Sequence, residues 1–120
     1  MLSFTITQHG GISVLQLNGA AQGDEALHTL NAAFGLVRPD DHLVLELSET
    51  TELDARAASR VHQTLHARPA APEVILVSPR DHISRQLSLH GVDHVSRIVR
   101  TMAEALDILA AQTGADEPNT

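Results

Sequence analysis

The sequence predicts one α/β domain with a mixed β-sheet and the element order β-β-α-β-α-β-α-β-α. Three observations lead to this prediction. Two β-like segments flank a Gly-Gly pair, two short uninterrupted apolar runs follow, and segments of helical periodicity stand between and after these runs. Strands that alternate with helices form parallel pairs, and an opening hairpin adds an antiparallel strand, which makes the sheet mixed.

The first 20 residues predict a β-hairpin. Residues 3–8 alternate between polar and apolar side chains, residues 12–17 are rich in aliphatic ones, and Gly10 and Gly11 supply the turn between them. A helix is expected next, with Asp24 and Glu25 in its first turn. Its apolar positions recur on one face: Leu27, Leu30, Phe34 and Val37.

The middle of the chain predicts two interior strands with a helix between them. Residues 43–47 and 74–77 are uninterrupted apolar runs, as expected for strands that are covered on both faces. Residues 48–53 predict a polar loop, and Thr51 or Asp54 is the expected N-cap of the helix that follows. The apolar face of that helix consists of Ala57, Ala58, Val61 and Leu65.

The last third predicts two helices around a short strand. Ser78 is the expected N-cap of the first helix, and Gly91 ends it. The strand is expected near residues 95–99. Thr101 and Glu104 then have the spacing of a capping box.

The predicted domain spans residues 1–113. Residues 114–120 are polar and are expected to form a disordered tail.

Composition narrows the class of function. The net charge is −7 and every basic residue is Arg, which argues against nucleic-acid binding because that binding depends on neutralising phosphates. The absence of Cys excludes disulfides and thiolate metal sites. No apolar run is long enough to span a membrane, and no signal peptide is visible, so we expect a cytoplasmic protein.

The acidic residues are unevenly distributed. Six of them fall between Arg38 and Arg56. They are Asp40, Asp41, Glu46, Glu49, Glu52 and Asp54. This cluster predicts either ordinary solvated surface or an acidic patch that selects a basic partner.

Several local motifs occur in an order that is typical of one family. An acid-Leu-Ser sequence, Glu46-Leu47-Ser48, ends the predicted third strand, and a loop leads from it to Asp54 at the start of a helix. The sequence Leu87-Ser88-Leu89-His90-Gly91-Val92-Asp93 precedes the last strand, and Gly19 follows the hairpin. Over residues 3–110 the chain resembles the STAS family, the fold of bacterial anti-sigma factor antagonists.

The resemblance implies a protein-binding regulatory module with no catalysis, no cofactor and no metal. Its partner would be an anti-sigma factor of the histidine-kinase-like ATPase type. The implied contact surface covers the acidic loop and the start of the second helix. Its residues are Glu46, Ser48, Glu49, Thr50, Thr51, Asp54, Ala55, Arg56, Ala58 and Ser59. Small Ala57 and Ala58 are expected to allow close approach of the partner.

One position departs from the family. The resemblance implies a phosphorylatable Ser directly after Asp54, but the chain has Ala55, which has no hydroxyl group to accept a phosphate. Two hypotheses follow. The domain is either permanently in the partner-binding form, or Glu52 and Asp54 imitate the phosphorylated form. The first is favoured, because a carboxylate carries about one charge and a phosphate nearly two.

Three hydroxyl groups are candidates to replace the missing acceptor. They belong to Thr50, Thr51 and Ser59. The alternative for each is a structural role in the loop or on the helix surface. An accessory STAS subunit of a transport or other signalling complex is the second hypothesis for function, and an enzyme of unknown chemistry is the third.

Other motifs point to chemistry only weakly. His62 and His66 are four residues apart and would share a helix face, but zinc needs at least one more protein ligand. No Gly-rich phosphate loop with its Lys follows a strand, which argues against nucleotide binding. The sequence predicts neither the partner's identity nor the oligomeric state.

Overall fold

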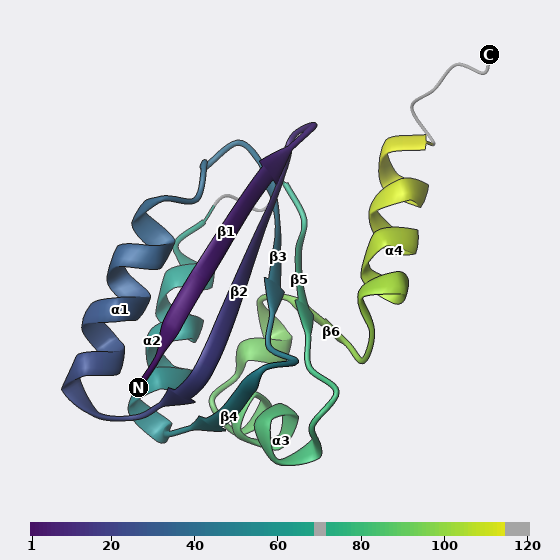
Figure 1. The fold of residues 1–120 in the computed structure, drawn as a ribbon. Coiled ribbons are helices and arrows are strands. Elements are labelled where there is room, and N and C mark those ends of the chain that lie inside the picture. Colours follow the sequence, from purple (N-terminus) through teal and green to yellow (C-terminus); the bar gives the residue numbers. More distant parts are fainter. Residues whose placement is uncertain (69–71, 115–120) are drawn as a thin grey trace.

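The computed structural model describes residues 1–68 and 72–114, which form an α/β fold with a mixed sheet (Figure 1). The strands are β1 (Ser3–His9), β2 (Ile12–Ala21), β3 (His42–Glu46), β4 (Thr50–Leu53), β5 (Val74–Val77) and β6 (Arg97–Val99). The helices are α1 (Gly23–Gly35), α2 (Ala55–His66), α3 (Asp81–Leu89), the 3-10 turn η1 (Val92–His94) and α4 (Met102–Gly114). The predicted fold class is confirmed.

The strands are arranged in the order β1-β2-β3-β5-β6. The β1–β2 hairpin is antiparallel, and every other pair in the sheet is parallel. The fourth strand, β4, pairs in parallel with the far end of β2. The segment that was expected to be a polar loop therefore contains a short strand. Its sequence, Thr-Thr-Glu-Leu, has no apolar run because its two middle residues are exposed.

Helices cover the two faces of the sheet unequally. Figure 1 shows α1 and α2 on one side and α4 on the other. The main core lies under α1, α2 and α3, and it is almost wholly aliphatic. The opposite face has a smaller core under α4, formed by Val44, Ile75, Val77, Ala105 and Leu109. The predicted core positions of α1 and α2 all belong to the main cluster or pack against it.

Two of the predicted helix ends are confirmed and one is wrong. The capping box of α4 is confirmed, since the Glu104 N–H donates to Thr101 Oγ1 and the Thr101 N–H donates to Glu104 Oε1, each at 3.1 Å. Gly91 follows α3 with a φ of +77°. The predicted Ser78 cap is wrong, because α3 begins only at Asp81. Ser78 is buried, and its hydroxyl pairs with that of Ser84 at 2.8 Å.

Residues 115–120 of the predicted tail lie outside the described residues. Gly114 is the last residue of α4.

Gly19 lets the hairpin strand β2 turn towards β4. Its φ of +103° is in the region that side chains disfavour, and the pairing register with β4 shifts between Gly19 and Ala20. A Cβ atom added here would collide with the carbonyl oxygen of Met1. The Gly19 N–H donates to the Glu49 carbonyl at 2.9 Å, so this position also holds the segment before β4.

Replacing Gly19 with Ala is expected to lower the free energy of unfolding by about 2 kcal/mol or more, because it adds both backbone strain and a steric clash. Urea unfolding monitored by circular dichroism measures this loss. Gly35→Ala is the matched control. An added Cβ there meets nothing within 4 Å, so a change of at most about 1 kcal/mol, towards higher stability, is expected. Equal effects of the two substitutions would contradict the role of Gly19.

Candidate partner-binding site

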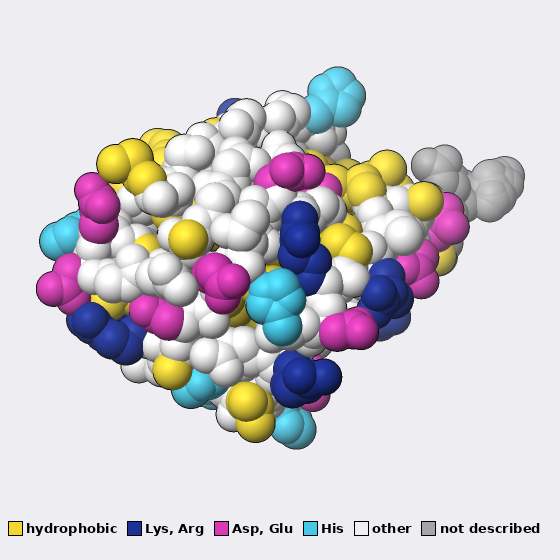
Figure 2. Space-filling view, turned by 60° about the horizontal axis from the view of Figure 1, so that its bottom comes forward, with side chains coloured by type: hydrophobic (Ala, Val, Ile, Leu, Met, Phe, Trp, Pro, Cys, Tyr) yellow, Lys and Arg dark blue, Asp and Glu magenta, His cyan; other side chains and the backbone are white. Residues whose placement is uncertain are grey.

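The predicted contact residues gather at one edge of the sheet. They lie after the carboxyl end of β3, along β4 and at the start of α2, and the start of α3 is next to them. This edge is at the bottom of Figure 1 and faces the viewer in Figure 2. In open α/β sheets, ligands and partners commonly meet the carboxyl ends of parallel strands.

Hydrogen bonds hold the loop after β3 in one shape. The Glu46 carboxylate accepts from the Ser48 N–H at 2.6 Å, which closes a tight turn. The Thr50 N–H donates to the Leu47 carbonyl at 3.0 Å, and the Thr50 hydroxyl donates to the Leu17 carbonyl at 2.9 Å. The loop is thus hydrogen-bonded to β2. A surface that is ordered before binding loses less conformational entropy when a partner docks.

The start of α3 holds the same segment from the other side. The Arg80 guanidinium donates to the Ser48 carbonyl, with Nη2 at 3.3 Å. The imidazole of His82 donates from Nε2 to the Thr51 carbonyl at 2.9 Å. No local sequence pattern indicated a role for either side chain. Both side chains are exposed. They add a guanidinium and an imidazole to a surface whose own segment, residues 46–54, contains four acidic residues and no basic one.

The carboxylate of Asp54 connects two helices. Its Oδ1 accepts from the Ala57 N–H at 2.8 Å, which confirms Asp54 rather than Thr51 as the N-cap of α2. Its Oδ2 accepts from the Gly23 N–H at 2.9 Å, at the start of α1. The backbone N–H of Asp54 also donates to Ala21 at the end of β2. Three elements therefore meet at this one residue.

Ala55 is the first residue of α2 and is exposed. Its neighbour Arg56 forms an ion pair with Asp24 of α1 at 2.7 Å, and both side chains are largely exposed. One turn further along α2, Arg60 donates to Asn31 of α1 at 2.6 Å. The starts of α1 and α2 therefore form one continuous surface, and Ala55 contributes a small apolar side chain to it.

The structure divides the ten predicted contact residues into two groups. Eight are accessible: Glu49, Thr51, Ala55 and Arg56 are exposed, and Glu46, Ser48, Asp54 and Ser59 are half-buried. The other two, Thr50 and Ala58, are fully buried. These two support the site from inside and offer a partner no surface. Burial also removes Thr50 as a substitute phosphate acceptor, and it removes Ala57 and Ala58 as points of close approach.

The six clustered acids do not form one patch. Asp40 and Asp41 precede β3 and Glu46 ends it, so the two groups lie at opposite ends of the strand. Asp41 is buried and accepts from the Ser13 hydroxyl at 2.9 Å. Of the clustered acids near the site, Glu49 and Glu52 are exposed, and Glu46 and Asp54 are half-buried. Figure 2 shows acidic, basic and His side chains interspersed on this face.

The histidine pair of α2 forms a ring contact. The rings of His62 and His66 are stacked with 5.7 Å between their centroids. Over residues 1–68 and 72–114, no group of three or more His, Cys, Asp or Glu side chains is placed to hold a metal ion. Within the same residues, no helix has both the length and the apolar character needed to cross a membrane.

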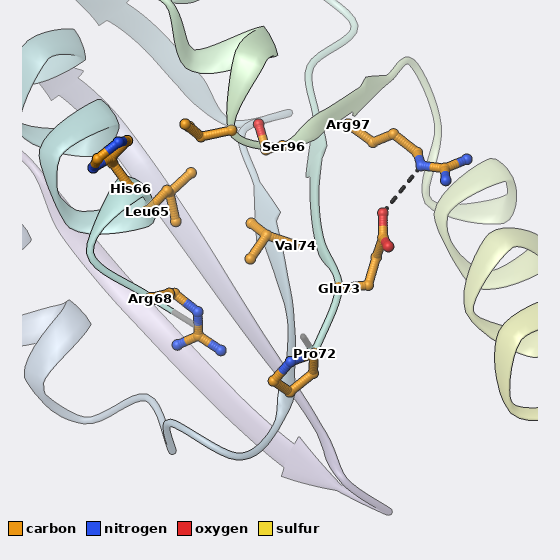
Figure 3. Close-up of a pocket in the computed structure, with 9 residues that line it drawn as sticks. Leu65, His66, Arg68, Pro72, Glu73, Val74, Ser96 and Arg97 are labelled. Atoms are coloured by element: carbon orange, nitrogen blue, oxygen red, sulfur yellow. Dashed lines mark hydrogen bonds and ion pairs between the residues drawn. The ribbon is translucent and has the colours of Figure 1, made fainter. Parts of the chain in front are cut away.

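A pocket of about 440 Å³ lies at the other end of the sheet (Figure 3). It is formed by the end of α2, the start of β5 and the segment before β6. Arg68 points into this region, donates to the Asp41 carbonyl at 2.8 Å and has a buried Nε without a partner in the described residues. Burial lowers the pKa of the Arg68 guanidinium, and the Asp41 carboxylate opposes that shift.

The charged side chains that line this pocket are Arg68, Glu73 and Arg97. Arg97 pairs with Glu73 at 3.0 Å, and Arg68 is close to the buried Asp41 outside the lining. No local sequence pattern indicated it, because its walls come from segments that are far apart in the chain.

The comparisons with known proteins agree with this geometry at the level of the fold. No protein-family model and no curated protein matches the sequence. Among solved structures, an anti-sigma factor antagonist from Mycobacterium paratuberculosis superposes with a TM-score of 0.72 at 22% identity, covering 90% of this chain and 93% of that one.

Two further structures are similar. The protein TM1081 has a TM-score of 0.69 at 22% identity, over 87% of this chain and 86% of that one. The unphosphorylated anti-sigma factor antagonist SpoIIAA has a TM-score of 0.66 at 17% identity, over 91% of this chain and 97% of that one. The chain thus has the STAS fold of anti-sigma factor antagonists.

Replacing Asp54 with Ala is expected to lower the free energy of unfolding by about 2 kcal/mol, because it removes the α2 cap and the bond to Gly23 together. Asp54→Asn keeps only one side-chain acceptor, so an intermediate loss is expected. Urea unfolding measures both changes. Glu52→Ala, at an exposed neighbouring position, should change stability by no more than about 0.5 kcal/mol. If Asp54→Ala lowered the free energy of unfolding as little as Glu52→Ala, the hydrogen bonds of the Asp54 carboxylate would not stabilise the fold.

Proposed function

We propose that this protein is a cytoplasmic regulatory module of the anti-sigma factor antagonist type, with no catalysis of its own. It docks the loop 48–51 and the start of α2 against a kinase-type anti-sigma factor. Occupying that factor releases the sigma factor it inhibits. The observation that carries the proposal is the STAS fold together with an accessible, hydrogen-bonded surface at the edge where α2 begins.

The chemistry of the surface supports binding by occupancy. Its accessible side chains are polar, small or of mixed charge, and the backbone beneath them is held by β2 and α3. Neither Ala55 nor its neighbours Asp54 and Arg56 offers a hydroxyl group. A partner that binds here forms and breaks no covalent bond at the position where relatives with a Ser accept phosphate.

The role of Asp54 supports the permanently binding form over an imitation of the phosphorylated form. Both of its carboxylate oxygens accept backbone N–H groups, so its charge is used within the fold. Glu52 is exposed, but it lies on β4 and carries about one charge against nearly two for a phosphate. We therefore propose that the protein binds its partner without being switched at Ala55.

Calorimetry against the kinase-type anti-sigma factors of the same genome, with and without ATP, tests the proposal. Intact-mass measurement follows each titration. We expect binding in both conditions and no added phosphate. Thr51→Arg places a bulky cation in the centre of the surface and should weaken binding about tenfold or more. Gln63→Arg adds the same group to an exposed position further along α2 and should leave the affinity unchanged.

Failure has two distinct forms. Binding with an added phosphate would mean that Thr51 or Ser59 replaces the missing Ser, and would contradict the unswitched form alone. No binding to any of these factors would overturn the antagonist proposal and favour an accessory subunit of a transport or other signalling complex.

Replacing Ala55 with Glu is expected to weaken binding of the anti-sigma factor about tenfold or more, because it introduces a negative charge where relatives carry phosphate. Ala55→Gln is the matched control, since it has the same size without the charge. Both residues suit the first turn of a helix, so circular dichroism should show two folded variants. If Gln weakens binding as much as Glu, size rather than charge is responsible.

Replacing Ala55 with Ser restores the hydroxyl at an exposed helix start. Incubated with a kinase-competent anti-sigma factor and ATP, this variant is expected to gain one phosphate and then to dissociate, while the natural chain keeps its mass. Intact-mass spectrometry before and after incubation measures the difference. An unmodified Ser variant would show that the partner does not present its nucleotide to this surface.

A further inference from the structure

The two edges of the sheet are protected very differently. One edge is β6, which has only three residues, contains the charged Arg97 and leads directly into α4. The other edge is β1, which has seven residues, all in register with β2. Among the described residues, no helix or loop crosses in front of β1 in Figure 1. An edge strand presents unpaired backbone N–H and C=O groups, and proteins usually guard it with charge, Pro or a bulge.

The β1 edge has none of these guards. No Asp, Glu, Lys, Arg or Pro occurs anywhere in residues 1–22, although the whole chain carries a net charge of −7. The pairing of β1 with β2 shows no register shift. The rest of the surface therefore repels a second copy of the chain, and this edge does not.

Backbone geometry makes the edge complementary to itself. The hairpin closes with the pair His9–Ile12 across a two-residue turn, and bonded positions alternate along an antiparallel pair. Phe4, Ile6 and Gln8 thus direct their N–H and C=O groups away from β2. A second β1, antiparallel and centred on Ile6, would place Phe4 opposite Gln8 and form about six hydrogen bonds.

Exposed apolar side chains flank the same edge. Met1, next to the start of β1, is 89% exposed. Leu36 is 55% exposed, and its carbonyl accepts from the Gln8 side chain at 3.1 Å, which places it near the other end of the strand. Antiparallel pairing would bring Met1 of one copy towards Leu36 of the other. It would also cover Phe4 and Ile6, which are only half-buried against α1.

We propose that β1 is a dimerisation edge, at which two copies of this chain pair antiparallel about Ile6 and join their sheets into one. The occupant is a second copy because the edge has no Asp, Glu, Lys or Arg side chain, matches itself in register and has apolar side chains at complementary ends. This proposal goes beyond the regulatory function and does not depend on it. The dimer forms without any anti-sigma factor.

Sedimentation velocity over a wide range of concentration, on the protein alone, tests the proposal. We expect a reversible monomer–dimer equilibrium. In the proposed register Thr5 of one copy lies opposite Thr7 of the other, and both side chains are exposed on the face away from α1. The double variant Thr5→Lys/Thr7→Lys places like charges opposite each other and should raise the dimer dissociation constant about tenfold or more.

A charge-swap experiment tests the register itself. Thr5→Glu/Thr7→Glu should also be monomeric alone, and an equimolar mixture with the Lys variant should restore a dimer, because each Lys then faces a Glu. The control Gln63→Lys/Ser88→Lys adds the same charge at exposed positions on α2 and α3 and should dimerise like the natural chain. Circular dichroism confirms that each variant is folded.

Three results would overturn the proposal. The natural chain could stay monomeric at every concentration, the Lys variant could dimerise as the natural chain does, or the mixture could stay monomeric. In the first case, an extended segment of another protein would be the remaining candidate for this edge.

Discussion

The carboxylate of Asp54 is the contact on which the candidate site depends. A β-sheet fixes the ends of its strands, but it does not fix how two helices begin beside one another. Here one side chain accepts the Ala57 N–H of α2 and the Gly23 N–H of α1, while its backbone bonds to the end of β2. Ala55, one residue further on, therefore has a defined position. The same two hydrogen bonds occupy both carboxylate oxygens of Asp54.

The loop between β3 and β4 extends this arrangement. Its backbone is bonded to β2 through Thr50 and to α3 through Arg80 and His82, so the surface is ordered on both sides before any partner arrives. Charges of both signs are interspersed across it (Figure 2). Recognition on such a surface depends on shape and on the placement of individual charges more than on net charge, which is a different picture from the acidic patch that the local sequence suggested.

The sequence patterns correctly predicted the elements that are determined by residues close together in the chain. The apolar runs of β3 and β5 and the capping box of Thr101 and Glu104 are each determined by neighbouring residues. The strand β4 was missed because its pairing depends on the bend at Gly19, which is far from Thr50 in the sequence. Burial of Thr50 was missed for a similar reason, since its hydroxyl binds the Leu17 carbonyl of β2. Ala58 belongs to the apolar helix face that the periodicity predicted, so its place among the expected contact residues conflicted with that periodicity. Ser78 stands in a sequence that is typical of a helix N-cap, but its side chain is buried and its hydroxyl forms a hydrogen bond with that of Ser84.

The unequal covering of the sheet divides the molecule into parts of different local stability. The main core joins β1, β2, β3, β5 and three helices, whereas α4 packs on a small cluster of Val, Ile, Ala and Leu side chains over β3 and β5. Few buried contacts mean a low free energy of local opening. We therefore expect the amide hydrogens of α4 to exchange with solvent before those of α1 and α2. When α4 opens, the outer face of β5 becomes accessible while the α2 surface keeps its structure.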